Sequence, residues 1–89
     1  MSIIENVLDI PAEHSSNIFG SCDAYVKKIE RTLKVTIIAR DSELKLVGAE
    51  GAVKRAASVF AQLLELSKRG NTITEQNVDY ALSLSFEDK

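Results

Sequence analysis

The chain has little of the residue types that build covalent cross-links, metal clusters or membrane spans. Its 89 residues include one cysteine, one proline, one histidine and no tryptophan. A single cysteine excludes an internal disulfide and a cysteine-based zinc cluster, and it is typical of a reducing compartment. No run approaches the roughly 18 apolar residues of a membrane span, and the acidic opening MSIIENVLDIP lacks the basic segment of a secretory signal. We therefore expect a cytoplasmic protein with no membrane partner.

Motifs of catalysis are missing as well. Neither GxxxxGK[ST] nor GxGxxG occurs, so no nucleotide-binding loop is predicted. His14 lies in a polar stretch and is expected to be solvated, and Cys22 has no evident base beside it and is expected to be a small, half-buried residue. The 13 carboxylates show no metal-ligand spacing. These residues predict no catalytic group, no metal and no other cofactor in the chain, which is not expected to be an enzyme by itself.

The composition is that of one folded domain with an uneven charge. Apolar residues make up 45% and charged residues 27% of the chain, which is ordinary for a globular protein. A net charge of −2 argues against a generally basic nucleic-acid binder. Residues 23–34 nevertheless carry four basic and two acidic side chains. Any contact with an anion must therefore be local.

Apolar periodicity predicts three strands and four helices. In chain order these are a strand in residues 5–10, a short helix in 12–19 ended by Gly20, a helix bearing Val26, Ile29 and Leu33, strands in 35–40 and 43–48, a long helix in 50–69, and a helix from Thr74 to about residue 85. Thr74 is a good N-cap, and Ile73 and Val78 are spaced as a hydrophobic staple around it. A three-stranded antiparallel sheet covered by helices on its apolar face satisfies this pattern. We predict an α+β domain.

The stretch IFGSCDAYVKKIERTLKVTI, residues 18–37, joins a glycine turn to a helix with a basic side. A glycine there serves either a plain turn or the close approach of a phosphate. With the order β-α-α-β-β-α, the stretch resembles a type I KH domain. The resemblance places Gly20 at the first glycine of the family's GxxG loop, Ser21 and Cys22 at its variable pair, and Asp23 at its second glycine.

The resemblance implies a site for single-stranded RNA, because KH domains clamp a single strand between this loop, its helices and the following strand. Carried over position by position, the candidate RNA-binding residues are Gly20, Ser21, Cys22, Asp23, Lys27, Lys28, Arg31, Ile37, Ile38 and Arg40. A run of lysine and arginine is also typical of any solvated helix face. The basic residues alone therefore do not decide between an RNA-binding face and an ordinary solvated one.

Asp23 weighs against tight binding. Its carboxylate is placed to cap its own helix, a contribution of about 1 kcal/mol. It would also put a negative charge where a phosphate would bind, and the two effects together could cost ten- to a hundred-fold in affinity. Asp23 is therefore either a helix cap in a scaffold that has lost its RNA site, or a residue that weakens that site.

Three segments narrow the resemblance to one family. The G-x-x-D loop with AYVKKIERTLKVTI, the ending LLELSKRGNTITEQNVDYALSLS and the opening VLDIPAEHSSNIFG are together similar to the N-terminal domain of PhoH-like proteins, from about Glu5 to Ser85. The resemblance implies an N-terminal piece of a longer cytoplasmic P-loop ATPase linked to RNA metabolism. ATP and magnesium would then be bound only by an ATPase core outside this sequence.

The expected organisation is one KH-like domain over residues 1–89, with its core in about 5–70 and the added helix in about 74–85. The expected function is weak contact with single-stranded RNA through the degenerate loop and the basic helix. Further expected partners are the parent's own ATPase core, RNA-processing proteins or a second copy of the chain. The alternative is a protein-interaction or oligomerisation domain that has lost nucleic-acid binding.

Overall fold

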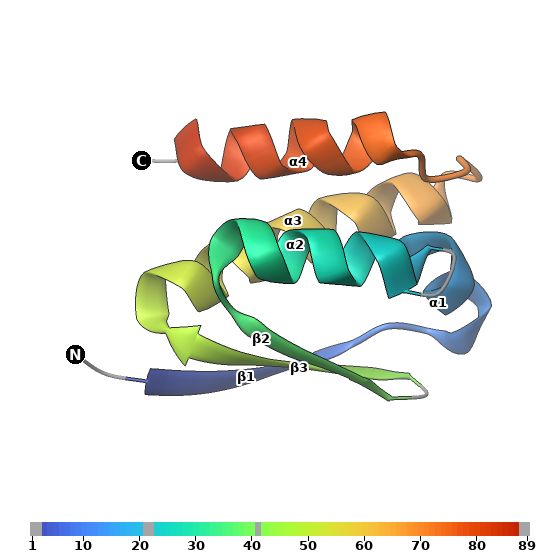
Figure 1. Ribbon diagram of the computed structural model, residues 1–89. Coiled ribbons are helices and arrows are strands. Elements are labelled where there is room, and N and C mark those ends of the chain that lie inside the picture. Colours follow the sequence, from blue (N-terminus) through green and yellow to red (C-terminus); the bar gives the residue numbers. More distant parts are fainter. Residues whose placement is uncertain (1–2, 21–22, 41, 88–89) are drawn as a thin grey trace.

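Seven secondary-structure elements follow one another in the predicted order (Figure 1). The computed structural model describes residues 3–20, 23–40 and 42–87. The elements are β1 (Ile3–Asp9), α1 (Ala12–Phe19), α2 (Ala24–Leu33), β2 (Thr36–Arg40), β3 (Glu43–Ala49), α3 (Glu50–Lys68) and α4 (Glu75–Glu87). This β-α-α-β-β-α order with one added helix confirms the predicted α+β, KH-like fold class. Among the described residues, no helix has both the length and the hydropathy to cross a lipid bilayer.

The sheet has the strand order β1-β3-β2, and both pairings are antiparallel. β3 is the central strand, and its Leu44 and Leu46 are fully buried. All four helices lie on one side of the sheet (Figure 1), so alternate residues of each strand face either the helices or solvent. We call the uncovered side the open face. It carries Thr36, Ile38 and Arg40 of β2 as well as Ile3, Glu5, Val7 and Asp9 of β1.

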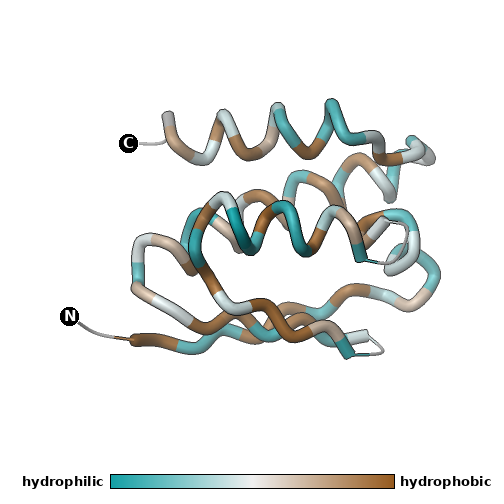
Figure 2. The backbone as a smooth tube through the Cα atoms, in the orientation of Figure 1, coloured by the Kyte–Doolittle hydropathy of each residue, from teal (hydrophilic) through white to brown (hydrophobic). Residues whose placement is uncertain are grey.

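The helices cover the sheet with the apolar stripes that the sequence predicts. Val26, Ile29 and Leu33 of α2 are buried, as predicted, and the hydropathy of α2 alternates along its length in Figure 2. On α3, Val53, Ala56, Phe60 and Leu63 are buried, while Ala57 and Leu64 are only half-buried. α3 therefore has an apolar flank that the rest of the chain does not fully cover.

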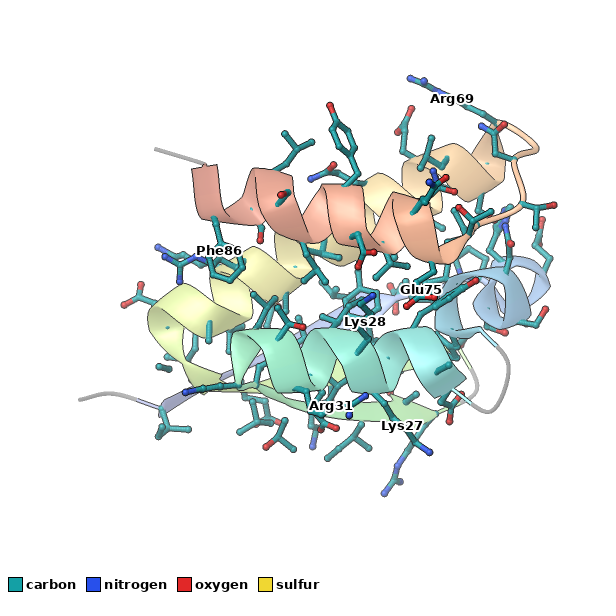
Figure 3. All side chains as sticks on the ribbon, turned by 45° about the horizontal axis from the view of Figure 1, so that its top comes forward. Lys27, Lys28, Arg31, Arg69, Glu75 and Phe86 are labelled. Carbon is teal, nitrogen blue, oxygen red and sulfur yellow. The ribbon has the colours of Figure 1, made fainter. Side chains whose placement is uncertain are left out.

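α4 joins the same core rather than forming a separate unit. Its start is fixed as predicted: the Asn77 N–H donates to Thr74 Oγ1 (3.3 Å), and the Thr74 N–H donates to Asn77 Oδ1 (2.9 Å). Ile73 and Val78 on either side of this cap are both buried. Near the other end of α4, the Arg55 guanidinium lies 5.4 Å from the centre of the Phe86 ring (Figure 3).

Candidate nucleic-acid interface

The loop between α1 and α2 begins at Gly20, where a neighbouring aromatic ring leaves no room for a side chain. Gly20 has φ +81°, and a Cβ atom added there would lie 2.8 Å from Cδ2 of Tyr25. The Tyr25 Oη–H donates to the Ile73 carbonyl oxygen (3.2 Å), which connects the loop to the segment before α4. Close packing inside the chain therefore explains Gly20 without a phosphate. Ser21 and Cys22, the next two candidate residues, lie outside the described residues.

Asp23 does not cap α2, so that prediction is wrong. Its backbone is left-handed (φ 59°, ψ 30°), and its side chain makes no capping hydrogen bond. A capping residue normally has an extended backbone, which aims its side-chain oxygen at the N–H groups of the first turn. In the left-handed conformation the Asp23 N–H donates instead to the Gly20 carbonyl oxygen (3.2 Å). The exposed carboxylate leaves the first-turn N–H groups without a side-chain cap, but it remains a negative charge at this helix end.

The basic residues of α2 divide into two sets by what they contact. Lys28 Nζ lies 2.9 Å from Glu75 Oε2 and 2.5 Å from Asp79 Oδ1, both on α4, and its side chain is 29% exposed. Hydrogen bonds to Asp79 and Glu75 raise the pKa of Lys28 above its ordinary value. Figure 3 shows Lys28 and Glu75 between the two helices. Lys28 therefore fixes α4 against α2, a contact that a phosphate would have to replace.

Lys27 and Arg31 project from α2 on the side away from α4 (Figure 3). Both are exposed, and neither forms an ion pair with any of the described residues. They are four residues apart, so they stand one turn above the other on the same side of the helix. They form the part of the predicted basic face that remains available to an anion.

The predicted groove strand does not present its residues on one surface. Ile37 is 9% exposed and faces the helices, whereas Ile38 and Arg40 lie on the open face. Strand alternation separates them, because successive side chains point to opposite sides of a sheet. Arg40 ends β2 at the end of the molecule where α2 begins (Figure 1). Along the strand it is therefore the β2 residue nearest the N-terminal end of α2, although its side chain lies on the open face.

Sequence reasoning missed a polar bridge between α2 and β2. The Ile37 N–H donates to Glu30 Oε2 (2.8 Å). β2 is an edge strand, so a helix carboxylate here satisfies a backbone donor that would otherwise be open to another chain. Glu30 stands four residues after Val26 and three before Leu33, at the border of the buried stripe. A carboxylate at that helical position is the signal that could have predicted the contact.

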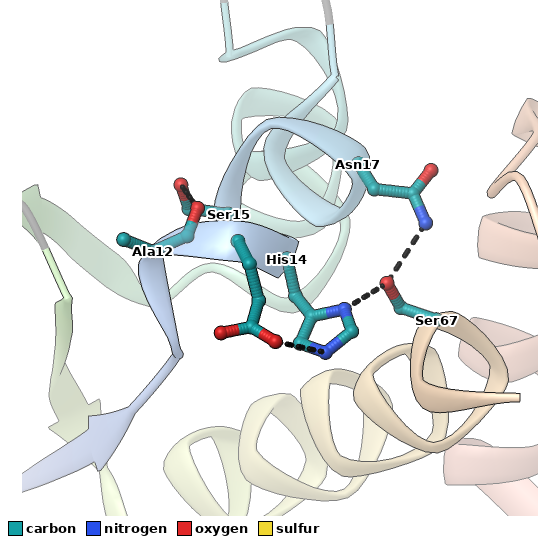
Figure 4. Close-up of polar contacts among 6 residues, drawn as sticks. Ala12, His14, Ser15, Asn17 and Ser67 are labelled. Atoms are coloured by element: carbon teal, nitrogen blue, oxygen red, sulfur yellow. Dashed lines mark hydrogen bonds and ion pairs between the residues drawn. The ribbon is translucent and has the colours of Figure 1, made fainter. Parts of the chain in front are cut away.

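His14 belongs to a polar cluster that joins α1 to α3, so the prediction of a solvated histidine is wrong (Figure 4). His14 Nδ1 lies within hydrogen-bond distance of Ser67 Oγ (2.7 Å), and Asn17 Nδ2 donates to the same oxygen (2.9 Å). Asn17 Oδ1 in turn accepts the Ile73 N–H (2.8 Å). Ser67 is 6% exposed, and Glu13 Oε2 is 3.9 Å from His14 Nε2, which is too far for a hydrogen bond. The cluster therefore holds α1 against α3. Because no carboxylate among the described residues is hydrogen-bonded to His14 Nε2 and Ser67 is buried, it does not have the arrangement of a serine nucleophile activated by a base.

Fold and site together define the class of protein. The chain is an α+β domain of KH-like layout in which a glycine loop leads into a helix with an exposed cationic side. Among the described residues, no three His, Cys, Asp or Glu side chains are placed to hold a metal ion.

Comparison with known proteins supports the predicted resemblance. The PhoH-like protein of Bacillus subtilis (strain 168) is 27% identical over 73 residues, covering 82% of this chain and 23% of that protein. The PhoH-like protein of Mycobacterium tuberculosis (strain H37Rv) is 24% identical over 81 residues, covering 91% of this chain and 23% of that protein. No family model matches the sequence. The predicted resemblance to PhoH-like proteins is thereby confirmed, and the chain spans about a quarter of the length of these relatives.

A solved structure shares the fold. The 1.5 Å crystal structure of a protein of unknown function from Aeropyrum pernix superposes with a TM-score of 0.73 at 16% sequence identity. The match covers 96% of this chain and 48% of that one. At this identity the likeness shows the arrangement of strands and helices alone.

Proposed function

We propose that this chain is an RNA-contacting module of a PhoH-like protein and that it binds single-stranded RNA weakly. The observation that carries the proposal is the position of Lys27 and Arg31. Both side chains are exposed on the side of α2 away from α4, and neither is ion-paired with a described residue. Lys28, by contrast, is held by two carboxylates of α4.

In this proposal the RNA backbone follows the basic side of α2. Lys27 and Arg31 contact phosphates, Arg40 supplies a third cation at the end of β2, and Gly20 and Asp23 lie beside the RNA strand. Bases would meet the outer edge of β2, except at Ile37, whose N–H is already bound by Glu30. Two or three phosphate contacts and one nearby carboxylate favour weak, salt-sensitive binding.

The role of the parent protein is part of the same proposal. In a PhoH-like ATPase, ATP and magnesium would be bound by a core outside this chain, and the module would orient RNA for that core in the cytoplasm. The support for this is the similarity to PhoH-like proteins of which the chain covers 23%.

The test is fluorescence anisotropy of a labelled single-stranded RNA against the 89-residue chain at several salt concentrations. With three phosphate contacts, affinity should fall about tenfold to twentyfold for a fourfold rise in salt. Lys27→Glu/Arg31→Glu should weaken binding and reduce the slope of log affinity against log salt by about 1.4. The control is Lys54→Glu/Lys68→Glu, the same charge change on exposed positions of α3, of which Lys54 is paired with Glu50 (3.2 Å). Equal weakening by the control pair would show that only net charge matters and would contradict the proposed site.

Asp23 gives a second arm of this test. Removing its charge should tighten RNA binding by up to about tenfold if a phosphate approaches the loop. Asp23→Asn removes only the charge, and Asp23→Gly also removes the side chain. Both residue types accept the left-handed backbone found there. Unchanged affinity in both variants would exclude the loop from the site and confine the contact to α2.

The open face of the sheet favours a second candidate, a protein-interaction domain. It exposes the apolar side chains of Ile3, Val7 and Ile38, and exposed apolar side chains gathered on one face are typical of interaction sites. The partner would be the ATPase core of the same parent or an RNA-processing protein. Titration with a separately produced core separates the two candidates, because Lys27→Glu/Arg31→Glu would leave a contact through the open face intact.

A further inference from the structure

The two edges of the sheet are protected to different degrees. On β2 the Glu30 carboxylate binds the Ile37 N–H and covers part of that edge. β1 forms the other edge, and it is a seven-residue strand without proline or glycine. Its Ile3 and Val7 are 68% and 48% exposed. A long edge strand with unpaired backbone groups is a template for pairing with another strand, although Glu5 and Asp9 limit the registers that β1 can adopt.

The hydrogen bonding of β1 shows which backbone groups face outward. The Ile10 N–H donates to the Ser42 carbonyl oxygen (2.8 Å), toward β3. Because backbone groups alternate between the two sides of a strand, Ile4, Asn6 and Leu8 also point toward β3. The N–H and C=O groups of Ile3, Glu5, Val7 and Asp9 then point toward the open edge.

We propose that two copies of this chain associate by antiparallel pairing of β1 with β1, which joins their sheets into one six-stranded sheet. A two-fold axis through Asn6 places Glu5 opposite Val7 of the second copy, and Ile3 opposite its Asp9. In this register, residues whose N–H and C=O groups point toward the open edge stand opposite residues of the second copy whose groups point toward its own open edge. The pairing therefore forms on the order of eight backbone hydrogen bonds and leaves every pairing with β3 intact.

The positions of the carboxylates on β1 favour this register over the other two that pair most of the strand. Pairing must shift by two residues at a time to keep each side chain on its own face of the sheet. An axis through Glu5 would place the two Glu5 carboxylates side by side, and an axis through Val7 would place Glu5 opposite Asp9. The axis through Asn6 opposes no two carboxylates. Glu5 and Asp9 of the second copy are then both diagonal neighbours of Glu5, at a greater distance than a directly opposite residue, and each Glu5 is already paired with its own Lys45 (2.8 Å).

The helix side of the edge also fits a second copy. A hollow of about 150 Å³ lies where β1 meets α3, and its lining is mostly apolar: Leu8, Asp9, Ile10, Ala57, Phe60, Ala61 and Leu64. In the proposed register Ile4 of one copy stands opposite Leu8 of the other, at the rim of this hollow. Ile4, Leu8 and Leu64 are all half-buried in the single chain. The pairing covers the apolar flank of α3 that the chain itself leaves open.

A pair of opposite substitutions at Val7 tests the interface and its register in the 89-residue chain. Val7→Glu would place a carboxylate opposite Glu5 of the second copy twice, once in each half of the dimer. It should raise the dimer dissociation constant about tenfold in sedimentation equilibrium. Val7→Lys would create two Glu–Lys pairs and should lower that constant several-fold.

The same substitutions separate association from folding. Within one chain, Val7 lies opposite Lys45 of β3, so Val7→Glu should stabilise the dilute monomer in thermal unfolding and Val7→Lys should destabilise it. The controls are Ile38→Glu and Ile38→Lys, on the same face at the other edge strand, which should not change dimerisation. In a sample of mixed isotope labelling, nuclear Overhauser contacts between Ile4 and Leu8 of different copies should appear.

Three results would overturn the proposal. The first is a wild-type chain that stays monomeric at the millimolar concentrations used for NMR. The second is a shift of dimerisation in the same direction by both Val7 variants, which would contradict the register. The third is an equal effect of the Ile38 variants, which would place the contact on the open face instead of the β1 edge.

Discussion

Gly20 and Asp23 both have a positive φ (81° and 59°), and they do so for different reasons. At Gly20 any Cβ would lie 2.8 Å from the ring of Tyr25, which is closer than such atoms normally approach. At Asp23 the side chain is exposed and makes no capping hydrogen bond, so the left-handed backbone gives this carboxylate no role in the helix. Packing inside the chain, and not the approach of a phosphate, therefore requires the glycine. Asp23 makes no capping hydrogen bond and can be replaced.

Substitutions at Asp23 distinguish a backbone role from a capping role. In the left-handed conformation Asp23→Gly should leave the free energy of unfolding unchanged or raise it slightly. Asp23→Thr should lower it by about 1–2 kcal/mol, because a β-branched residue is strongly disfavoured at positive φ. Urea unfolding followed by circular dichroism measures both changes. A capping carboxylate would give a different result, since threonine and glycine are about equally good N-caps and the two variants would then match.

At the scale of elements, the contact between α2 and α4 depends on the charge of Lys28. Its pKa is raised in the folded chain by Asp79 and Glu75. The ammonium form therefore stabilises the fold fully at pH values below the pKa of an unfolded lysine, and this contribution is lost as pH rises through the raised pKa. We expect Lys28→Met to be less stable than the wild type at neutral pH, and the difference should shrink in strongly alkaline solution.

Urea unfolding from neutral to strongly alkaline pH measures the difference in free energy of unfolding between the wild type and Lys28→Met. Lys27→Met is the matched control, because Lys27 is exposed and forms no ion pair with a described residue. A stability difference for Lys28→Met that stays constant from neutral to alkaline pH would show that the side chain acts through packing alone.

The order and type of the elements could be predicted because each carries its own local signal. The stripe Val26, Ile29, Leu33 and the cap at Thr74 depend only on spacing along the chain. Contacts between distant elements leave no such signal. Nothing near Lys28 in the sequence shows that Glu75 and Asp79 are its partners. The sequence therefore predicted which elements carry the candidate residues, but not the contacts that these residues make.

One property of the predicted groove strand follows from its sequence alone. Ile37 and Ile38 are neighbours on a strand, so alternation alone places their side chains on opposite faces. The resemblance to a KH domain places both side chains in one groove, whereas the geometry of a strand places them on opposite faces. The contacts of His14 with Ser67, 53 residues away, are by contrast beyond any local pattern.

At the scale of the whole molecule, the question is whether α4 is an appendage to a KH-like core or part of it. Val78 of α4 is as fully buried as Val59 of α3. If the chain unfolds as one cooperative unit, Val78→Ala and Val59→Ala should each lower the global free energy of unfolding by about 2 kcal/mol. Tyrosine fluorescence and circular dichroism should report the same urea midpoint in each variant.

Hydrogen exchange decides between the two possibilities. An appended helix would open by itself, so Val78→Ala would speed exchange of amides in α4 and leave those of β3 unchanged. We expect instead that exchange in β3 accelerates equally in both valine variants. The reason is that Tyr25, Lys28 and Asn17 bond α4 or the segment before it to α1 and α2. Loss of α4 would then loosen the loop that begins at Gly20, so the added helix would support the face proposed to meet RNA.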